Sequence, residues 1–249
     1  MLDFQAITRK YYAEWLDCDE QDFDGGVRYV SSPKRDVKLP GYSNRFILSI
    51  FRLNNAVIVS YSSKIQEQIN KMKTDFSTIE SFNSQLSDYL NRSFLAKIDT
   101  GIKFIFEQHS PILINKLVTL EKRNFSLFLN FRLALGQREW DGMRKDFEEL
   151  SGRGYCIAKI IDGKAVSMTD PPTMPFMADI VQEMGISTLP YYRNKGYAKE
   201  VVSACISKIV SDGKCPLWSC AADNRASEQL AYSVGFKKFC DVYSVVLER

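Results

Sequence analysis

The sequence predicts a mixed α/β protein, and three observations support that class. Short apolar runs of strand length recur along the 249 residues, segments with helical spacing stand between them, and pairs of turn residues join some runs into hairpins. The composition, with 45% hydrophobic and 25% charged residues, is typical of a globular chain and excludes a disordered or collagen-like one. The length allows one large domain or two modest ones.

Residues 1–112 form the first block, an N-terminal α+β region. Its clearest feature is a hairpin with arms at 46–53 and 56–61, joined by Asn54 and Asn55. Asparagine tolerates the positive φ that a two-residue turn needs, so this segment predicts two paired strands. The remaining elements expected in this block are a helix over 3–19, a strand over 27–31, helices over 62–73 and 80–91, and a strand over 102–106.

Residues 113–249 form the second block. Asp162 and Gly163 give a strong turn signal between two apolar arms, which predicts another hairpin. Trp140 begins an apolar stripe at helical spacing and is expected in the core, as is Trp15. The other elements expected are strands over 116–120, 177–188, 216–221 and 239–247, and helices over 122–135, 139–150, 196–211 and 225–234.

Charge and reactive residues exclude several classes of protein. Thirty-three Lys and Arg against 30 Asp and Glu leave a formal charge of +3, too little to indicate a nucleic-acid or membrane-surface binder. The one histidine, His109, excludes a histidine-rich metal site. Six cysteines without C-x-x-C spacing predict buried free thiols in a reducing compartment. The N-terminal residues lack the pattern of a secretory signal, so we expect a cytoplasmic protein.

The most informative segment runs from residue 183 to 210, where an apolar strand leads through the turn RNKGYA, residues 193–198, into an amphipathic helix. The start of such a helix has unpaired backbone N–H groups. Together with the positive end of the helix dipole they form an anion site suited to a pyrophosphate. Gly196 lets the backbone approach a phosphate, and Arg193, Lys195 and Lys199 add positive charge.

A second motif follows this segment. The pattern N-x-x-S-x-x-L-A-x-x-x-G-F begins at Asn224, directly after an apolar strand, and ends at Gly235 and Phe236, a glycine and an apolar follower typical of a helix C-terminus. With the R-x-x-G-x-A turn, it resembles the GNAT superfamily of acyl-CoA N-acyltransferases over roughly residues 114–249. Within that superfamily, residues 183–198 are most similar to the group containing the zwittermicin A resistance acetyltransferases, which carries an extra N-terminal segment.

The resemblance implies a fold, a cofactor and a set of binding residues. Residues 113–249 are expected to adopt the GNAT fold, in which the turn grips the pyrophosphate of acetyl-CoA and the pantetheine arm lies between two splayed strands. Backbone N–H groups near Gly185 and Ile186 are expected to stabilise the oxyanion. The cofactor-binding residues implied are Ile186, Thr188, Arg193, Asn194, Lys195, Gly196, Tyr197, Ala198, Asn224 and Ser227.

The resemblance also points to catalytic residues. An ammonium has no lone pair, so the acceptor amine needs a general base. Glu183, on the strand that borders the acyl end of the cleft in this family, is the first candidate. Gln182 is one alternative, because a one-residue shift turns a strand side chain to the other face, and Asp179 is the weaker one. Tyr232 is the candidate acid for the CoA thiolate. However, the family's tyrosine position falls on Ala231, so packing is the alternative role for Tyr232.

The predicted function is acetyl-CoA-dependent transfer of an acetyl group to the primary amine of a small molecule, such as an antibiotic or a metabolite, with no metal. One alternative is an acyl-CoA-binding regulatory or interaction module without efficient turnover, and another is transfer to a protein or aminoacyl-tRNA. We expect no nucleic-acid or membrane partner, and a homodimer is one candidate assembly. Residues 1–112 are either a helper domain that shapes the acceptor pocket or a degenerate acyltransferase-like half that only buries surface.

Overall fold

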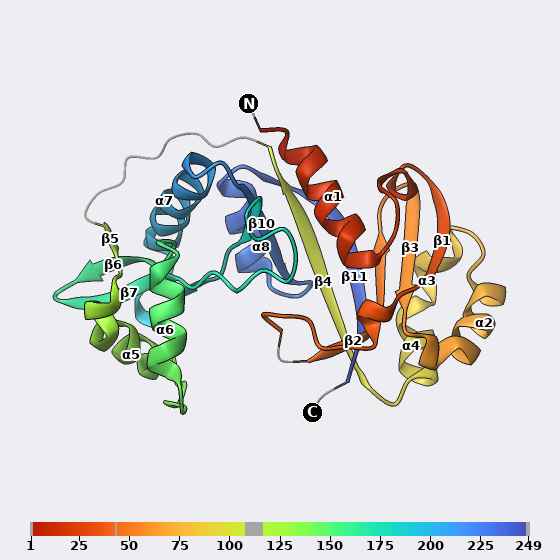
Figure 1. The fold of residues 1–249 in the computed structure, drawn as a ribbon, viewed down its shortest axis with the longest axis horizontal. Helices are drawn as coiled ribbons and strands as arrows, with labels where there is room; N and C mark the ends of the chain where they lie inside the picture. Colours follow the sequence, from red (N-terminus) through yellow and green to blue (C-terminus); the bar gives the residue numbers. More distant parts are fainter. Residues whose placement is uncertain (1, 43, 108–116, 248–249) are drawn as a thin grey trace.

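The structure is a computed structural model that describes residues 2–42, 44–107 and 117–247 (Figure 1). His109 and the predicted boundary at residues 112 and 113 lie outside these ranges. The α-helices are α1 (Phe4–Leu16), α2 (Gln66–Asp75), α3 (Ser81–Ser84), α4 (Leu86–Ser93), α5 (Phe125–Ala134), α6 (Met143–Gly152), α7 (Tyr197–Ser211) and α8 (Arg225–Ser233). The strands are β1 (Gly26–Ser31), β2 (Arg45–Arg52), β3 (Ala56–Tyr61), β4 (Lys97–Phe106), β5 (Leu117–Thr119), β6 (Ile157–Ile161), β7 (Lys164–Thr169), β8 (Val181–Glu183), β9 (Ile186–Thr188), β10 (Cys215–Ala221) and β11 (Phe236–Leu247).

Within the described residues the strands form a seven-stranded sheet, ordered β1-β3-β2-β11-β4-β10-β8, and a four-stranded sheet, ordered β5-β6-β7-β9. The predicted mixed α/β class is therefore confirmed. Figure 1 shows β5–β7 with α5 and α6 at one end of the molecule and β1–β3 with α2–α4 at the other. The long strand β4, from the first half of the sequence, lies between β10 and β11 from the second half and is antiparallel to both.

The helices cover both faces of this arrangement. On one face, α1 packs Tyr11, Tyr12 and Trp15 against β10 and β11, while α5 and α6 cover β6 and β7. On the other face, α7 and α8 cover β4 and β10, and α2 and α4 cover β2 and β3. Cys215 and Cys220, five residues apart on β10, contact opposite cores.

The two predicted hairpins are confirmed. Strands β2 and β3 pair across Asn54 and Asn55, although neither asparagine has the expected positive φ, and Asp162 (φ 48°) with Gly163 (φ 73°) turns β6 into β7. Both φ values are positive, as the two central residues of a tight type I′ hairpin turn require. The predicted helices over 196–211 and 225–234 correspond to α7 and α8 within a residue.

Several predictions about local structure were wrong. The helix expected over 80–91 is divided into α3 and α4, and the strand expected over 102–106 begins at Lys97. The single strand expected over 177–188 is divided into β8 and β9 around Met184 and Gly185. A Cβ on Gly185 would lie 2.4 Å from Oδ1 of Asp170 and 2.6 Å from its carbonyl oxygen, so this close approach requires glycine. Trp140 is 40% exposed, because α6 begins only at Met143 and the tryptophan lies in the loop before it.

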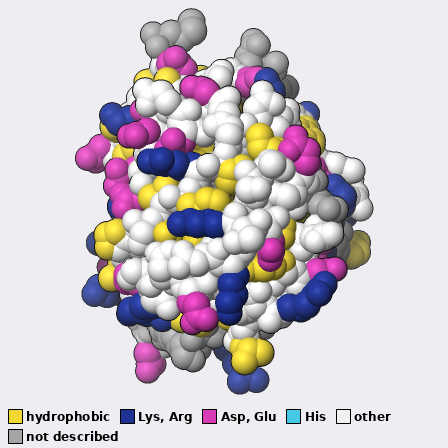
Figure 2. Space-filling model, turned by 90° about the vertical axis from the view of Figure 1, so that its right-hand side faces the viewer, with side chains coloured by type: hydrophobic (Ala, Val, Ile, Leu, Met, Phe, Trp, Pro, Cys, Tyr) yellow, Lys and Arg dark blue, Asp and Glu magenta, His cyan; other side chains and the backbone are white. Residues whose placement is uncertain are grey.

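The distribution of charge on the surface gives little indication of a binding partner. On the face shown in Figure 2, acidic and basic side chains are interspersed among hydrophobic and neutral ones. Among the described residues, no helix is both long and apolar enough to cross a membrane.

Candidate functional site

The site is built around the point where β9 separates from β10. At its start, β10 pairs in parallel with β8, from Cys215 opposite Val181 to Leu217 opposite Glu183. One more backbone hydrogen bond follows, from Met184 N–H to Leu217 O at 3.1 Å. Beyond it β10 continues beside β4, whereas β9 pairs with β7. Two neighbouring parallel strands therefore splay apart after Met184.

The splay leaves one edge of β9 open. Gly185 O accepts from Asp170 N–H, and Leu189 N–H donates to Val166 O, so the backbone groups of the odd-numbered residues point toward β7. Backbone groups alternate between the two edges of a strand, so those of Ile186 and Thr188 point toward the gap. An extended chain with amide groups can pair along such an edge as an added strand.

The predicted anion site lies at the far end of this edge, where α7 begins. Gly196, with φ of 82°, precedes the helix, and the first intrahelical bond runs from Glu200 N–H to Gly196 O. The N–H groups of Tyr197, Ala198 and Lys199 therefore have no intrahelical acceptor. Among the described residues, no atom beyond its chain neighbours lies within 4 Å of where a Cβ on Gly196 would be, so the positive φ is what demands glycine here.

The side chains around this helix start are mostly exposed. Arg193 donates from Nε to the carbonyl oxygen of Thr188 at 3.3 Å, which fixes the turn against the end of β9. Lys195 Nζ lies 4.5 Å from the ring centroid of Tyr191, which is 79% exposed. Asn194 has a φ of 59°, a left-handed conformation that asparagine tolerates. The turn therefore presents positive charge and backbone donors at one exposed position.

Asn224 and Ser227 lie at the start of α8, close to the open half of β10. Asn224 Oδ1 accepts from Ser227 N–H at 3.1 Å and caps the helix. Ser227 Oγ accepts from Trp218 Nε1 at 3.1 Å. These bonds leave the amide N–H groups of Asn224 available to a ligand, whereas the Ser227 hydroxyl already serves the packing of Trp218.

Glu183 lies at the base of the splay, on the face that α1 covers. It is 8% exposed and accepts a short hydrogen bond from the hydroxyl of Ser219 on β10. Burial, followed by the negative charge of Glu183, raises the pKa of Tyr42 and of Tyr11. Tyr42 also hydrogen-bonds Glu183, whereas the Tyr11 hydroxyl is buried with no partner among the described residues. A buried carboxylate is thus surrounded by hydroxyl groups.

The two alternative bases are in different surroundings. Gln182 is 2% exposed, and its amide nitrogen donates to the carbonyl oxygens of Pro172 and Glu183, both at 2.9 Å. An amide held in this way has no capacity to take a proton. Asp179 is exposed on the turn before β8. Of the three, Glu183 alone combines a carboxylate with a place at the splay.

Tyr232 does not face the splay. Its hydroxyl donates to Oε1 of Glu228 at 3.2 Å, and its ring packs edge-on against Phe104 on β4 with centroids 5.7 Å apart. Burial first, and then the Glu228 hydrogen bond, raises the pKa of Tyr232. Ala231 is fully buried at the position the family's tyrosine occupies. The geometry favours a packing role, and the acid role stays a prediction.

Sequence reasoning missed several residues that the fold brings to this point. Asp170 lies against Gly185 and accepts from Arg132 Nη1 at 2.7 Å. Burial raises the pKa of Asp170, and Arg132 opposes that shift. A cavity of about 330 Å³ lies beside Ser219 and is also lined by Gly101 and Lys103 of β4. Asp170 comes at the end of a strand and before Pro171-Pro172, which is a weak sequence signal for a functional residue. The sequence of β4 has no such signal.

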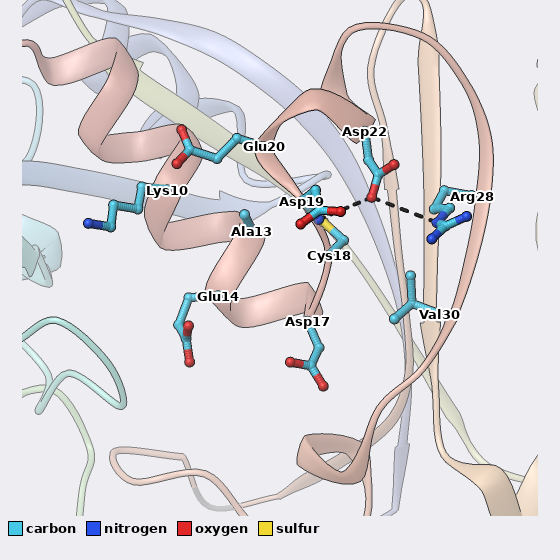
Figure 3. Close-up of a pocket in the computed structure, with 10 residues that line it drawn as sticks. All are labelled: Lys10, Ala13, Glu14, Asp17, Cys18, Asp19, Glu20, Asp22, Arg28 and Val30. Atoms are coloured by element: carbon cyan, nitrogen blue, oxygen red, sulfur yellow. Dashed lines mark hydrogen bonds and ion pairs between the residues drawn. The ribbon is translucent and has the colours of Figure 1, made fainter.

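A second cavity, of about 420 Å³, lies away from the splay between α1 and β1 (Figure 3). Its lining is rich in carboxylates, but these serve local structure. Asp22 accepts from the backbone N–H of Asp19 at 3.1 Å and lies 3.8 Å from Nε of Arg28. Among the described residues no group of His, Cys, Asp and Glu is arranged to hold a metal ion.

Comparison with known proteins agrees with this geometry. The family model for GNAT acetyltransferases matches residues 44–245, so the chain belongs to the GNAT acetyltransferase family and is an acyltransferase. No curated protein sequence matches the chain.

Two solved structures show the same fold. A GNAT-family acetyltransferase from Colwellia psychrerythraea aligns with 98% of this chain and 96% of its own, at 12% identity and a TM-score of 0.55. A structure assigned to the same family, from Novosphingobium aromaticivorans DSM 12444, is 20% identical with a TM-score of 0.50. That alignment covers 61% of this chain and 66% of the other.

Proposed function

We propose that the protein transfers the acetyl group of acetyl-CoA to the primary amine of a small molecule. The observation that carries this proposal is the splay of β9 from β10, with a helix N-terminus at its outer end and a buried carboxylate, Glu183, at its base. The N-terminus of α7 suits a pyrophosphate, and the open edge of β9 suits an amide-bearing arm. The carboxylate of Glu183, at the inner end of the splay, suits proton removal from an amine. The family assignment supports a CoA thioester as the donor.

The cofactor residues divide by the group they contact. The N–H groups of Tyr197, Ala198 and Lys199, with Arg193 and Lys195, hold the pyrophosphate. The backbone of Ile186 and Thr188 pairs with the pantetheine amides, and the Asn224 side chain meets them from α8. The N–H of Ile186 faces the gap beside Gly185 and stabilises the oxyanion. The Met184 N–H is already bonded to Leu217 O and serves no such role.

The nitrogen of the acceptor ammonium loses two protons, one to the general base before it attacks and one that ends on the CoA thiolate, while one bond is exchanged for another. Acetyl-CoA supplies a thioester, whose C–S bond breaks as the amine nitrogen forms a C–N bond with the carbonyl carbon. Glu183 is too buried to meet the amine directly, whereas Ser219 lines the cavity and donates to Glu183. Ser219 therefore accepts the amine proton while passing its own to the carboxylate. The CoA thiolate is a tolerable leaving group, because a thiol pKa is near 8.5.

The N-terminal region has a part in this proposal. Strand β4 supplies Lys103 and Gly101 to the cavity, α1 supplies Tyr11, and the loop before β2 supplies Tyr42 next to Glu183. Gly41 holds that loop in place, because a Cβ there would lie 2.1 Å from the carbonyl oxygen of Thr173. We propose that residues 1–112 shape the acceptor side of the site, as the helper interpretation of that block states.

Glu183→Gln tests the assignment of the base. We expect kcat to fall by about a hundredfold, because general base catalysis contributes factors of this order, and the pH–rate profile to lose its ascending limb. Turnover is followed by release of CoA with a panel of primary amines. Asp179→Asn, at the exposed alternative, is the matched control and should leave both readouts unchanged. An unaltered profile in Glu183→Gln would remove Glu183 from the base role. Acetyl-CoA binding without turnover of any amine would favour the binding module instead.

A further inference from the structure

The face of the sheet that bears the cavity carries positive charge without carboxylate partners. Lys103 points from β4 toward α1, with Nζ 5.8 Å from the ring centroid of Tyr12 and 5.9 Å from that of Trp15. Arg35 lies 5.2 Å from the same Trp15 ring and is fully buried. In the part of the chain that the structure describes, neither cation has a carboxylate within ion-pair distance.

Glu183 is the complementary case. It is a buried carboxylate with hydroxyl partners, Ser219 and Tyr42, and within residues 2–42, 44–107 and 117–247 it has no cation within ion-pair distance. Burying a charge with no opposite charge nearby costs free energy, and a bound ligand of opposite charge lowers that cost. The same holds, more weakly, for the half-buried ammonium of Lys103.

The strand register places these two charges on either side of Ser219. Lys103 is the direct cross-strand partner of Ser219, and Glu183 lies on the opposite side of β10, where it accepts from the Ser219 hydroxyl. Neighbouring strands are about 4.8 Å apart, and Glu183 lies opposite Leu217, two residues from Ser219, so the Cα atoms of Glu183 and Lys103 are about 12 Å apart. A ligand nitrogen at Ser219 thus lies close to the carboxylate, and an adjoining anionic group lies within reach of Lys103.

The other charged group at the cavity does not cancel this pattern. Asp99 lines its outer end and is paired with Lys97, with Nζ and Oδ1 3.1 Å apart. Both of these side chains are largely exposed, so solvent screens them. The remaining lining is neutral, and the volume of about 330 Å³ suits a small molecule.

We propose that the acceptor is zwitterionic, a free amino acid whose α-amine meets Ser219 and Glu183 and whose carboxylate meets Lys103. This inference rests on the proposed acetyltransferase function, and it adds the class of acceptor. Trp15 and Tyr12 hold the Lys103 side chain in place, and the buried Arg35 adds positive potential behind Trp15. An amine without an adjoining anion leaves Lys103 unpaired and is the poorer substrate.

The test compares each of several amino acids with its α-carboxamide, which keeps the amine and the side chain but replaces the carboxylate by a neutral group. For the intact protein we expect kcat/KM to be about tenfold or more higher for the acid, since an interaction with a charged group contributes at this scale. In Lys103→Met the ratio of the two values should fall toward one. Lys237→Met, which removes an exposed lysine paired with Glu107, is the matched control and should keep the ratio of the parent protein.

Three outcomes overturn the inference: equal turnover of acids and carboxamides, a preference that persists in Lys103→Met, or neither turnover nor thermal stabilisation with any amino acid. Calorimetric titration of acetyl-CoA separates this failure from that of the proposed function. Binding of acetyl-CoA together with turnover of simple amines keeps the acetyltransferase proposal and rejects only the zwitterionic acceptor. Loss of acetyl-CoA binding rejects both.

Discussion

The two sides of the splay differ in how they are made. The proposed cofactor side consists mainly of backbone groups, the open edge of β9 and the first turn of α7 within residues 186–199, to which the turn and Asn224 add side chains. The proposed acceptor side consists of side chains from four places in the sequence, Tyr42, Lys103, Glu183 and Ser219. A site made of backbone needs a short local pattern, whereas a site made of side chains needs the whole fold to assemble it.

Gly196→Glu should break the cofactor side while leaving the acceptor side intact. The substitution places a negative charge at the anion site and a side chain at a φ of 82°, so we expect acetyl-CoA affinity to fall by about a hundredfold or more. Calorimetry measures the change. Gly213→Glu is the control, because Gly213 also has a positive φ, of 77°, at the other end of α7. If both variants bind acetyl-CoA equally well, the pyrophosphate site is misplaced.

Ser219→Ala should impair the acceptor side while leaving the cofactor side intact. Removing the hydroxyl that links the cavity to Glu183 is expected to lower kcat by about 10- to 100-fold, since proton transfer contributes at this scale. Acetyl-CoA affinity should stay the same, because the side chain points toward α1 and away from α7. Ser211→Ala, which removes an exposed hydroxyl bonded to Lys208 O, is the control. A normal kcat in Ser219→Ala would mean that the proton takes another route.

Arg132→Met should lower the free energy of unfolding, because Arg132 pairs with Asp170, which lies against Gly185 at the splay. Burial raises the pKa of Asp170, and a carboxyl whose folded-state pKa is raised destabilises the fold progressively as the pH rises through that pKa. Removing Arg132 raises the pKa further, so the deficit in unfolding free energy should be about 1–3 kcal/mol near neutral pH and smaller in mild acid. Urea unfolding at both pH values measures it. Arg123→Met, at an exposed pair with Glu121, should change little at either pH. A deficit that grows in acid would contradict this account.

The sequence predicted the local structure of the proposed cofactor side well because its determinants are local. The R-x-x-G-x-A turn lies at the start of α7, and the Asn224 motif at the start of α8, where the structure has them. The strand expected over 177–188 failed at Gly185, because the reason for the break is a close approach to Asp170, fifteen positions earlier. A packing requirement of this kind has no signature in the segment itself.

Apart from Glu183, the residues of the proposed acceptor side could not be predicted from the sequence, for the same reason. Lys103 belongs to a strand whose neighbours, β10 and β11, lie more than a hundred residues later in the chain. Nothing in the local pattern indicates that it becomes the partner of Ser219. Trp140 shows the related error at the surface. Its spacing to Met143 and Phe147 is helical, but the helix begins after it, so the stripe that buries those two does not include the tryptophan.

The position of β11 also has a consequence for how the chain is made. Strands β2 and β4 each pair along one edge with β11. During synthesis on the ribosome, both edges therefore stay unpaired until residues 236–247 have emerged. At ordinary translation speeds that interval is on the order of ten seconds. Unpaired apolar strands are templates for unwanted pairing during such a delay. The nascent first half therefore presents two unpaired apolar strand edges until the last strand arrives.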